Sequence, residues 1–186
     1  MIKADIVQSN NMLDVDSNLN IAYQLIDGLR QSTPQILVLK DTTGRYVGYN
    51  SEYTDLEFAY RSTNFNSTTF SYDAENHTVT VDPNLYTDYI LNGTIQYYTT
   101  STNTSATIYV KIVEIDENGT ETTLSPFYRI PLGQTAGNMR LLNLNYVFNV
   151  KSTTKKIKFQ ITTNDTVRPT VANVSFILTG LCHYMN

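Results

Sequence analysis

The sequence contains one cysteine, no tryptophan and only seven alanines. Because Cys182 is the single cysteine, an intrachain disulfide framework is excluded. Charged residues make up 16% of the 186 positions, against roughly a quarter in ordinary globular proteins. No window approaches the roughly 18 apolar residues of a transmembrane helix, and the first residues lack the apolar core and cleavage site of a signal peptide. We therefore expect synthesis in the cytoplasm, no disulfide staples and no membrane span.

Hydroxyl and amide side chains are abundant instead. The chain has 27 Thr, 19 Asn and 12 Ser, and Thr, Val and Ile together give 54 β-branched residues. Such side chains are stiff at χ1 and suit a pleated sheet better than a helix. The composition therefore argues against a helical bundle and a doubly wound α/β enzyme, and it predicts an all-β domain whose surface is polar but sparsely charged.

Short alternating segments bounded by turn residues recur along the chain. The clearest is a hairpin in which Asn118-Gly119 joins residues 107–115 to 120–124, because Asn-Gly supplies the positive φ angles of a tight turn. Both faces of 107–115 carry apolar residues, which predicts an internal strand. The other predicted strands are 36–40, 45–49 (paired with 36–40 through a Gly44 turn), 56–60, 68–72, 78–81, 127–132, 142–150, 157–161 and 171–184.

This rhythm predicts an antiparallel β-sandwich or jelly roll of about 11 or 12 strands. Pro83-Asn84 and Asn92-Gly93 interrupt the pattern, and the net charge changes there, from −7 over residues 1–93 to +3 over residues 94–186. We therefore expect an N-terminal β-lobe at 1–90 and a jelly roll at 91–186, or one continuous domain.

The segment 17–29 fits two periodicities. Leu19, Ile21, Tyr23 and Leu25 alternate at period two, which favours a strand. Helical spacing of apolar residues over the same stretch, with Ser17 or Asn18 as a cap, is the alternative.

The sequence carries no catalytic or metal motif. It lacks a Gly-x-Ser-x-Gly elbow, a His-Glu-x-x-His pair and a phosphate loop. His77 and His183 lie far apart, and Cys182 cannot pair with His183 as nucleophile and base because neighbours in a strand point to opposite faces. We expect no catalytic residue, no metal site and no cofactor, and hence no enzyme.

Fourteen tyrosines are the most function-like feature. A tyrosine ring offers a flat apolar face and a hydroxyl, which suits subunit interfaces and glycan stacking. The candidates for such contacts are Tyr46, Tyr49, Tyr53, Tyr97 and Tyr98. Tyr97 and Tyr98 are adjacent, so at most one of them enters the core. The alternative is that these residues are ordinary strand formers that replace the missing tryptophan.

A basic cluster consists of Lys151, Lys155, Lys156 and Lys158. One interpretation is a solvated strand edge, where lysine discourages edge-to-edge pairing. The other is a patch that docks on an acidic partner. The overall net charge of −4 offers no general attraction for nucleic acid.

The segment 94–181 resembles jelly-roll carbohydrate-binding and galactose-binding-like modules. The resemblance is carried by residues 95–98, 106–112, 146–150, 156–161 and 172–176, which share the strand rhythm of those modules. It covers about half of the chain and implies a jelly roll, but it transfers no binding residue.

The amino-acid composition resembles that of bacteriophage virion proteins, because it is rich in Thr, Asn and Tyr and poor in Cys and Trp. The resemblance implies a capsid decoration, auxiliary capsid or head-fibre component, made in the host cytoplasm and located in the virion. Its partners would be other virion proteins and copies of itself, commonly in a trimer, without nucleic acid or membrane. The alternative is a receptor- or glycan-binding module of a phage tail or baseplate, with a host glycan as partner. Positions in the head, neck and tail all fit.

Overall fold

The computed structural model describes residues 19–22, 34–63, 70–84, 86–103, 105–131 and 139–182, with the backbone alone for 125–131 and Cys182. Twelve strands occur in these residues, as β1 (Gln35–Asp41), β2 (Arg45–Tyr46), β3 (Thr54–Asp55), β4 (Tyr60–Thr63), β5 (Ser71–Asp73), β6 (Thr78–Thr80), β7 (Tyr86–Tyr98), β8 (Thr107–Asp116), β9 (Glu121–Pro131), β10 (Arg140–Asn149), β11 (Thr154–Thr163) and β12 (Thr170–Cys182). The predicted all-β class is confirmed.

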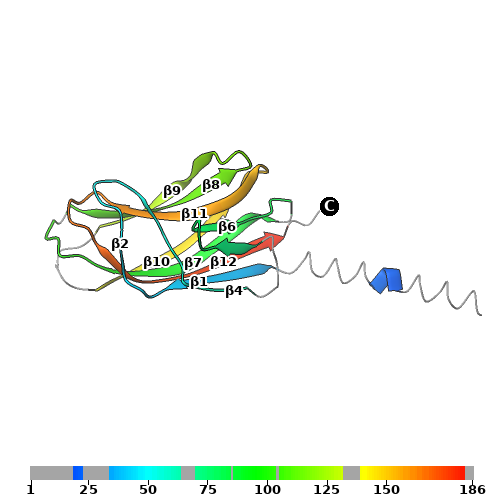
Figure 1. Cartoon of the computed structure of the whole chain (residues 1–186), viewed down its shortest axis with the longest axis horizontal. Helices are drawn as coiled ribbons and strands as arrows, with labels where there is room; N and C mark the ends of the chain where they lie inside the picture. The colour runs from blue at the N-terminus through cyan, green and yellow to red at the C-terminus, as the bar shows by residue number, and fades with distance from the viewer. Residues whose placement is uncertain are drawn as a thin grey trace, which may run out of the picture.

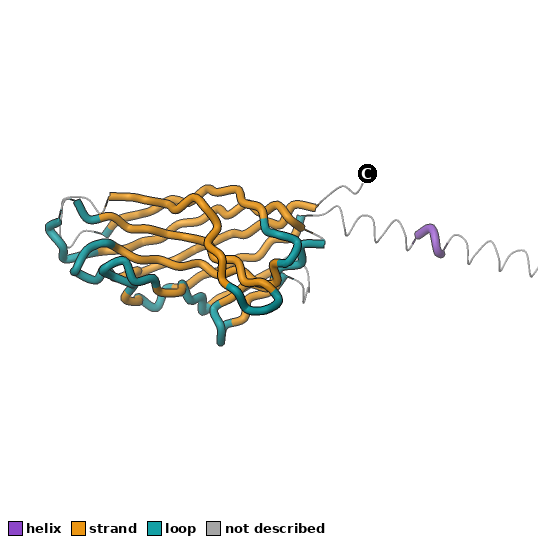
Figure 2. Tube along the Cα trace, turned by 90° about the horizontal axis from the view of Figure 1, so that it is seen from above, coloured by secondary structure: helices purple, strands orange, loops and turns teal. Residues whose placement is uncertain are grey.

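The strands form two antiparallel sheets of six strands each. Sheet A has the order β10-β7-β12-β1-β4, with β2 paired to β12, and sheet B has the order β5-β6-β11-β8-β9, with β3 paired to β11. Figure 1 shows the two sheets as the layers of a sandwich, and Figure 2 shows the long strands running lengthwise along it. The antiparallel β-sandwich expected from the strand rhythm is confirmed.

The boundary expected between residues 90 and 91 lies inside β7. This strand pairs along its length with β10 and β12, and strands from both sides of residue 90 contribute to both sheets. Asn92-Gly93, which suggested an interruption, lies in the middle of β7. Gly93 is opposite Phe176, and a Cβ at position 93 would lie 2.5 Å from the Phe176 ring. The glycine therefore makes room for a core aromatic residue, and the described strands form one sandwich without a separate N-terminal lobe.

Aromatic rings fill the space between the sheets. Phe176 of sheet A contacts Phe159 of sheet B, with ring centroids 5.1 Å apart, and both contact Phe58, at 5.4 and 6.2 Å respectively. Tyr89 stacks on Phe148 at 5.5 Å in the same core. These rings join segments far apart in the sequence, so the core depends on long-range pairing.

The Asn118-Gly119 hairpin is confirmed. It joins β8 to β9, Gly119 has φ of +80°, and its amide donates to the carbonyl of Asp116. The predicted internal position of residues 107–115 is also confirmed, because β8 lies between β11 and β9.

The predicted hairpin between residues 36–40 and 45–49 is wrong. Gly44 has φ of +67°, as a turn requires, but β1 and β2 do not pair with each other. Both pair with β12, which is 13 residues long and reaches past β1 to β2.

The strand predicted at 56–60 is also wrong. Residues 56–59 connect β3 in sheet B to β4 in sheet A. Leu56 and Phe58 are buried in the core and account for the alternating pattern. In the segment 17–29, residues 19–22 form a helical turn, so the favoured strand is wrong there, and the rest lies outside the described residues.

Candidate functional site

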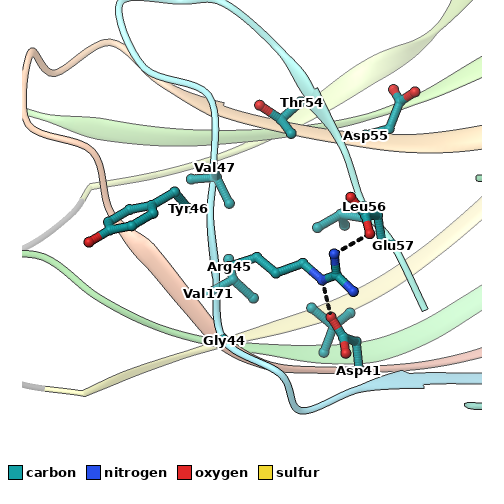
Figure 3. A pocket seen from close by; sticks show the side chains of 11 residues that line it. Asp41, Gly44, Arg45, Tyr46, Val47, Thr54, Asp55, Leu56, Glu57 and Val171 are labelled. Carbon is teal, nitrogen blue, oxygen red and sulfur yellow. Dashed lines mark hydrogen bonds and ion pairs between the residues drawn. The ribbon is translucent and has the colours of Figure 1, made fainter. Parts of the chain in front are cut away.

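A hollow of about 350 Å³ opens at one side of the sandwich, where β2 and β3 approach β12. Figure 3 shows Arg45 reaching across it toward Asp41 at the end of β1 and Glu57 after β3. Arg45 Nε donates to Asp41 Oδ2 at 2.8 Å, and Arg45 Nη1 pairs with Glu57. The Thr43 hydroxyl donates to Asp41 at 2.8 Å.

These contacts hold the charges of the hollow in fixed pairs. Burial of Asp41 raises the pKa of its carboxyl, but the hydrogen bonds from Arg45 and Thr43 outweigh burial and leave that pKa below its ordinary value. The hydrogen bond to Asp41 is the main cause of a raised pKa at Arg45. The arrangement can hold the turn between β1 and β2 in one conformation. It also occupies the Arg45 guanidinium, which an anionic ligand would need.

Replacement of Asp41 by asparagine is expected to lower the free energy of unfolding by about 1–3 kcal/mol at pH 7, because Arg45 loses a charge-assisted hydrogen bond. Since folding lowers the pKa of Asp41 from 3.8, its contribution is complete above that value and is lost as the pH falls through the folded-state pKa. Urea unfolding of wild type and Asp41→Asn at pH 7 and pH 3 should therefore show a difference that shrinks in acid. Exposed Glu117 is the control, and an equal loss from Glu117→Gln at pH 7 would contradict this role.

The structure brings two of the five candidate tyrosines together. Tyr46 of β2 and Tyr98 of β7 are both register partners of Thr170 in β12, one on each side of it. Directly opposed residues in a sheet project from the same face, and both rings are exposed, Tyr46 at 68% and Tyr98 at 38%. With Thr42, Thr43, Gly44, Thr170 and Ala172 they line a second, more open hollow of about 400 Å³.

The other three candidate tyrosines lie elsewhere. Tyr97 is 3% exposed and belongs to the core, so it is wrong as a contact residue, while the prediction that only one of Tyr97 and Tyr98 enters the core is confirmed. Tyr49 and Tyr53 are half-buried. The Arg168 guanidinium covers the Tyr49 ring at 4.4 Å and the Lys111 ammonium covers the Tyr53 ring at 3.9 Å.

The lysine cluster is largely paired with carboxylates. The ion pairs are Lys151 with Glu114 (3.6 Å), Lys156 with Asp73 (3.8 Å), and Lys158 with Asp55 (3.5 Å) and Glu121 (2.6 Å). The strand-edge interpretation is wrong because β11, which carries Lys155, Lys156 and Lys158, lies between β6 and β8. A patch for an acidic partner stays a prediction, and binding there would compete with these ion pairs.

The outer face of sheet A carries a feature that the sequence patterns did not single out. One register row across four strands reads Ile36, Thr179, Ile90 and Val147. Beside it lies Ile177, which is 42% exposed, while Val147 is 58% exposed. In the sequence, the sign of this face is Val147. It is the single apolar residue among the asparagines on the outward face of residues 142–150.

This face is almost free of charge. In β1, β7, β10 and β12 the outward positions between the apolar residues are mostly Asn, Thr, Ser and Gln. Lys40 and Asp88 are the charged residues among the described outward positions of these strands, and their charges cancel. Sheet B differs, since Lys156, Lys158 and their carboxylate partners lie on its outer side.

No protein-family model matches the sequence, and no curated protein sequence matches it. In the described residues, no group of His, Cys, Asp and Glu is arranged to hold a metal ion. Among the same residues, no helix has the length and hydropathy needed to cross a membrane.

Solved structures resemble the chain in fold. VP2 of infectious bursal disease virus, in a subviral particle, matches 80% of this chain and 33% of the VP2 chain, with a TM-score of 0.52 and 17% identity. The Eiger TNF from S. frugiperda matches 82% of this chain and 94% of its own, with a TM-score of 0.56 and 11% identity. Murine APRIL matches 80% of this chain and all of its own, with a TM-score of 0.51 and 11% identity.

These likenesses define the chain as a jelly-roll β-sandwich, the class of fold predicted from the sequence. The chain spans about one third of the length of the VP2 chain. At these identities the likeness is one of fold.

Proposed function

We propose that this chain is a non-enzymatic structural protein of a virion, and more narrowly a capsid decoration, auxiliary capsid or head-fibre component of a bacteriophage. The observation that carries the proposal is the outer face of sheet A, where the row from Ile36 to Val147 and the neighbouring Ile177 lie on a surface without net charge. Burial of apolar side chains drives association, and a face without net charge meets a copy of itself without strong charge repulsion.

The size of this face suits a subunit interface. The five strands β10, β7, β12, β1 and β4 lie about 4.8 Å apart and average about 30 Å in length, which gives the sheet a flat area of roughly 700 Å². Stable interfaces bury roughly 800 Å² on each partner. The jelly roll that the chain shares with VP2, which was solved in a subviral particle, further supports a role in particle assembly. A homo-oligomer, commonly a trimer in proteins of this kind, would use this face.

The double substitution Val147→Asp with Ile177→Asp is expected to weaken self-association at least 10-fold, because two like charges would enter an apolar contact. Both residues are exposed, so the fold should be retained. Sedimentation velocity over a range of protein concentrations measures the effect. The control is Ser152→Asp with Thr153→Asp, which adds the same charge in the exposed turn before β11.

Wild type that stays monomeric at high concentration and does not bind empty capsids would contradict the proposal. Association that survives in the Val147/Ile177 variant would also contradict it. Imaging of the intact particle would then give the position and copy number of the chain.

A second candidate function is binding of a host glycan or receptor. The specific observation in its favour is the pair of exposed rings, Tyr46 and Tyr98, on either side of Thr170.

A further inference from the structure

The Tyr46–Tyr98 hollow, lined by Thr42, Thr43, Gly44, Tyr46, Tyr98, Thr170 and Ala172, has the dimensions of a ligand site. Its two rings stand on strands that flank β12, so about 10 Å separates their backbones, which is two strand spacings. Its volume of about 400 Å³ falls within the roughly 300–1,000 Å³ of small-molecule pockets. Tyr46 and Tyr98 therefore flank Thr170 on the two sides of the hollow.

The chemistry of the lining selects one class of ligand. It offers aromatic faces and hydroxyl groups, and none of its seven residues is charged. An aromatic face accepts the apolar C–H side of a sugar ring, and hydroxyl groups exchange hydrogen bonds with sugar hydroxyls. A nucleic acid strand could also stack on the rings, but it needs a basic groove for its phosphates. The neighbouring Arg45 is already engaged by Asp41 and Glu57.

The rim of the hollow is held in place before a ligand arrives. Asp41 accepts hydrogen bonds from the Thr43 amide at 3.2 Å and from Arg45 Nε at 2.8 Å. These bonds fix the turn that leads directly into Tyr46. On the opposite side, Tyr98 is the last residue of β7 and pairs with Thr170 of β12. Less conformational entropy is then lost on binding, which favours a weakly interacting ligand such as a sugar.

We propose that the Tyr46–Tyr98 hollow binds a neutral saccharide, with sugar rings packed on the two tyrosine faces and sugar hydroxyls bonded to Thr42 and Thr170. The inference deepens the second candidate function and is independent of self-association through sheet A. The hollow lies at Thr170, and the apolar row crosses β12 at Thr179, about 30 Å away along the strand.

The test uses the full chain on an array of neutral, sialylated and sulfated glycans, followed by titration with neutral oligosaccharides of glucose, galactose and N-acetylglucosamine. Binding of neutral glycans is expected. Tyr46→Ala and Tyr98→Ala should each weaken it at least 10-fold, whereas Tyr46→Phe and Tyr98→Phe should keep most of it, because the ring face remains. Tyr60→Ala is the matched control, since Tyr60 is 54% exposed on β4, outside the hollow.

Absence of neutral-glycan binding at millimolar concentration would overturn the inference, as would binding of charged glycans alone. Equal weakening by Tyr60→Ala and Tyr46→Ala would also overturn it. Thermal melts establish that each variant is folded. The Val147/Ile177 variant should bind glycans as wild type does, so a failure of self-association and a failure of saccharide binding are told apart.

Discussion

Replacement of Phe176 by alanine is expected to lower the free energy of unfolding by about 3–5 kcal/mol. The Phe176 ring is fully buried and contacts Phe159 of the opposite sheet and Phe58 of the crossing segment. Its removal takes away apolar contacts with both sheets at once. It also leaves a cavity beside Gly93, which has no side chain to fill it. A loss of this size is a large part of the roughly 5–15 kcal/mol that stabilises a domain.

Urea unfolding at low protein concentration, followed by circular dichroism, measures this effect. Ile177→Ala is the matched control, because Ile177 is the next residue of β12 and points to the outer face. Its cost should be about 0.5 kcal/mol in the monomer. Similar losses from Phe176→Ala and Ile177→Ala would show that the contact between the sheets contributes little.

Replacement of Gly48 by alanine is expected to cost about 3 kcal/mol or more, at or above the upper end of the usual range for overpacking. A Cβ at position 48 would overlap the carbonyl oxygen of Glu52 and lie 2.8 Å from its carbonyl carbon. Both are backbone atoms, so no side chain can move aside. The turn is also held from the other side, since the Thr163 amide donates to the Gly48 carbonyl and the Ser51 amide donates to the Thr163 carbonyl.

Thermal unfolding of Gly48→Ala beside Gly119→Ala measures this effect. A Cβ at Gly119 would meet open space, so its cost is limited to the backbone strain of a positive φ, about 1–2 kcal/mol. Equal costs at the two positions would mean that the turn around Gly48 yields to the added methyl group.

Part of the tyrosine site was predictable. The alternation of strand residues required Tyr97 and Tyr98 to face opposite ways, and the structure has Tyr97 in the core and Tyr98 outside. The meeting of Tyr46 with Tyr98 was not predictable, because 52 positions separate them and each is aligned by its own pairing with Thr170. The register between strands that are distant in sequence depends on tertiary packing, which local sequence patterns do not specify.

The lysine cluster shows the same limit. Its four side chains are close in sequence, which suggested a shared patch. Three of them pair with Asp55, Asp73, Glu114 and Glu121, which come from four other strands. Only the assembled sheet B brings these carboxylates within reach.

The sequence by itself determined the all-β class and the Asn118-Gly119 hairpin, because χ1 stiffness, period-two alternation and turn chemistry act over a few residues. The tertiary structure alone decided that β7 runs through Asn92-Gly93, that the described residues of both halves share one core, and where the sparsely charged face of sheet A and the tyrosine-lined hollow lie. The physical reason is that these features arise from pairing and packing between strands distant in sequence. Gly93, which suggested an interruption in the sequence, thus provides the space that the Phe176 ring requires.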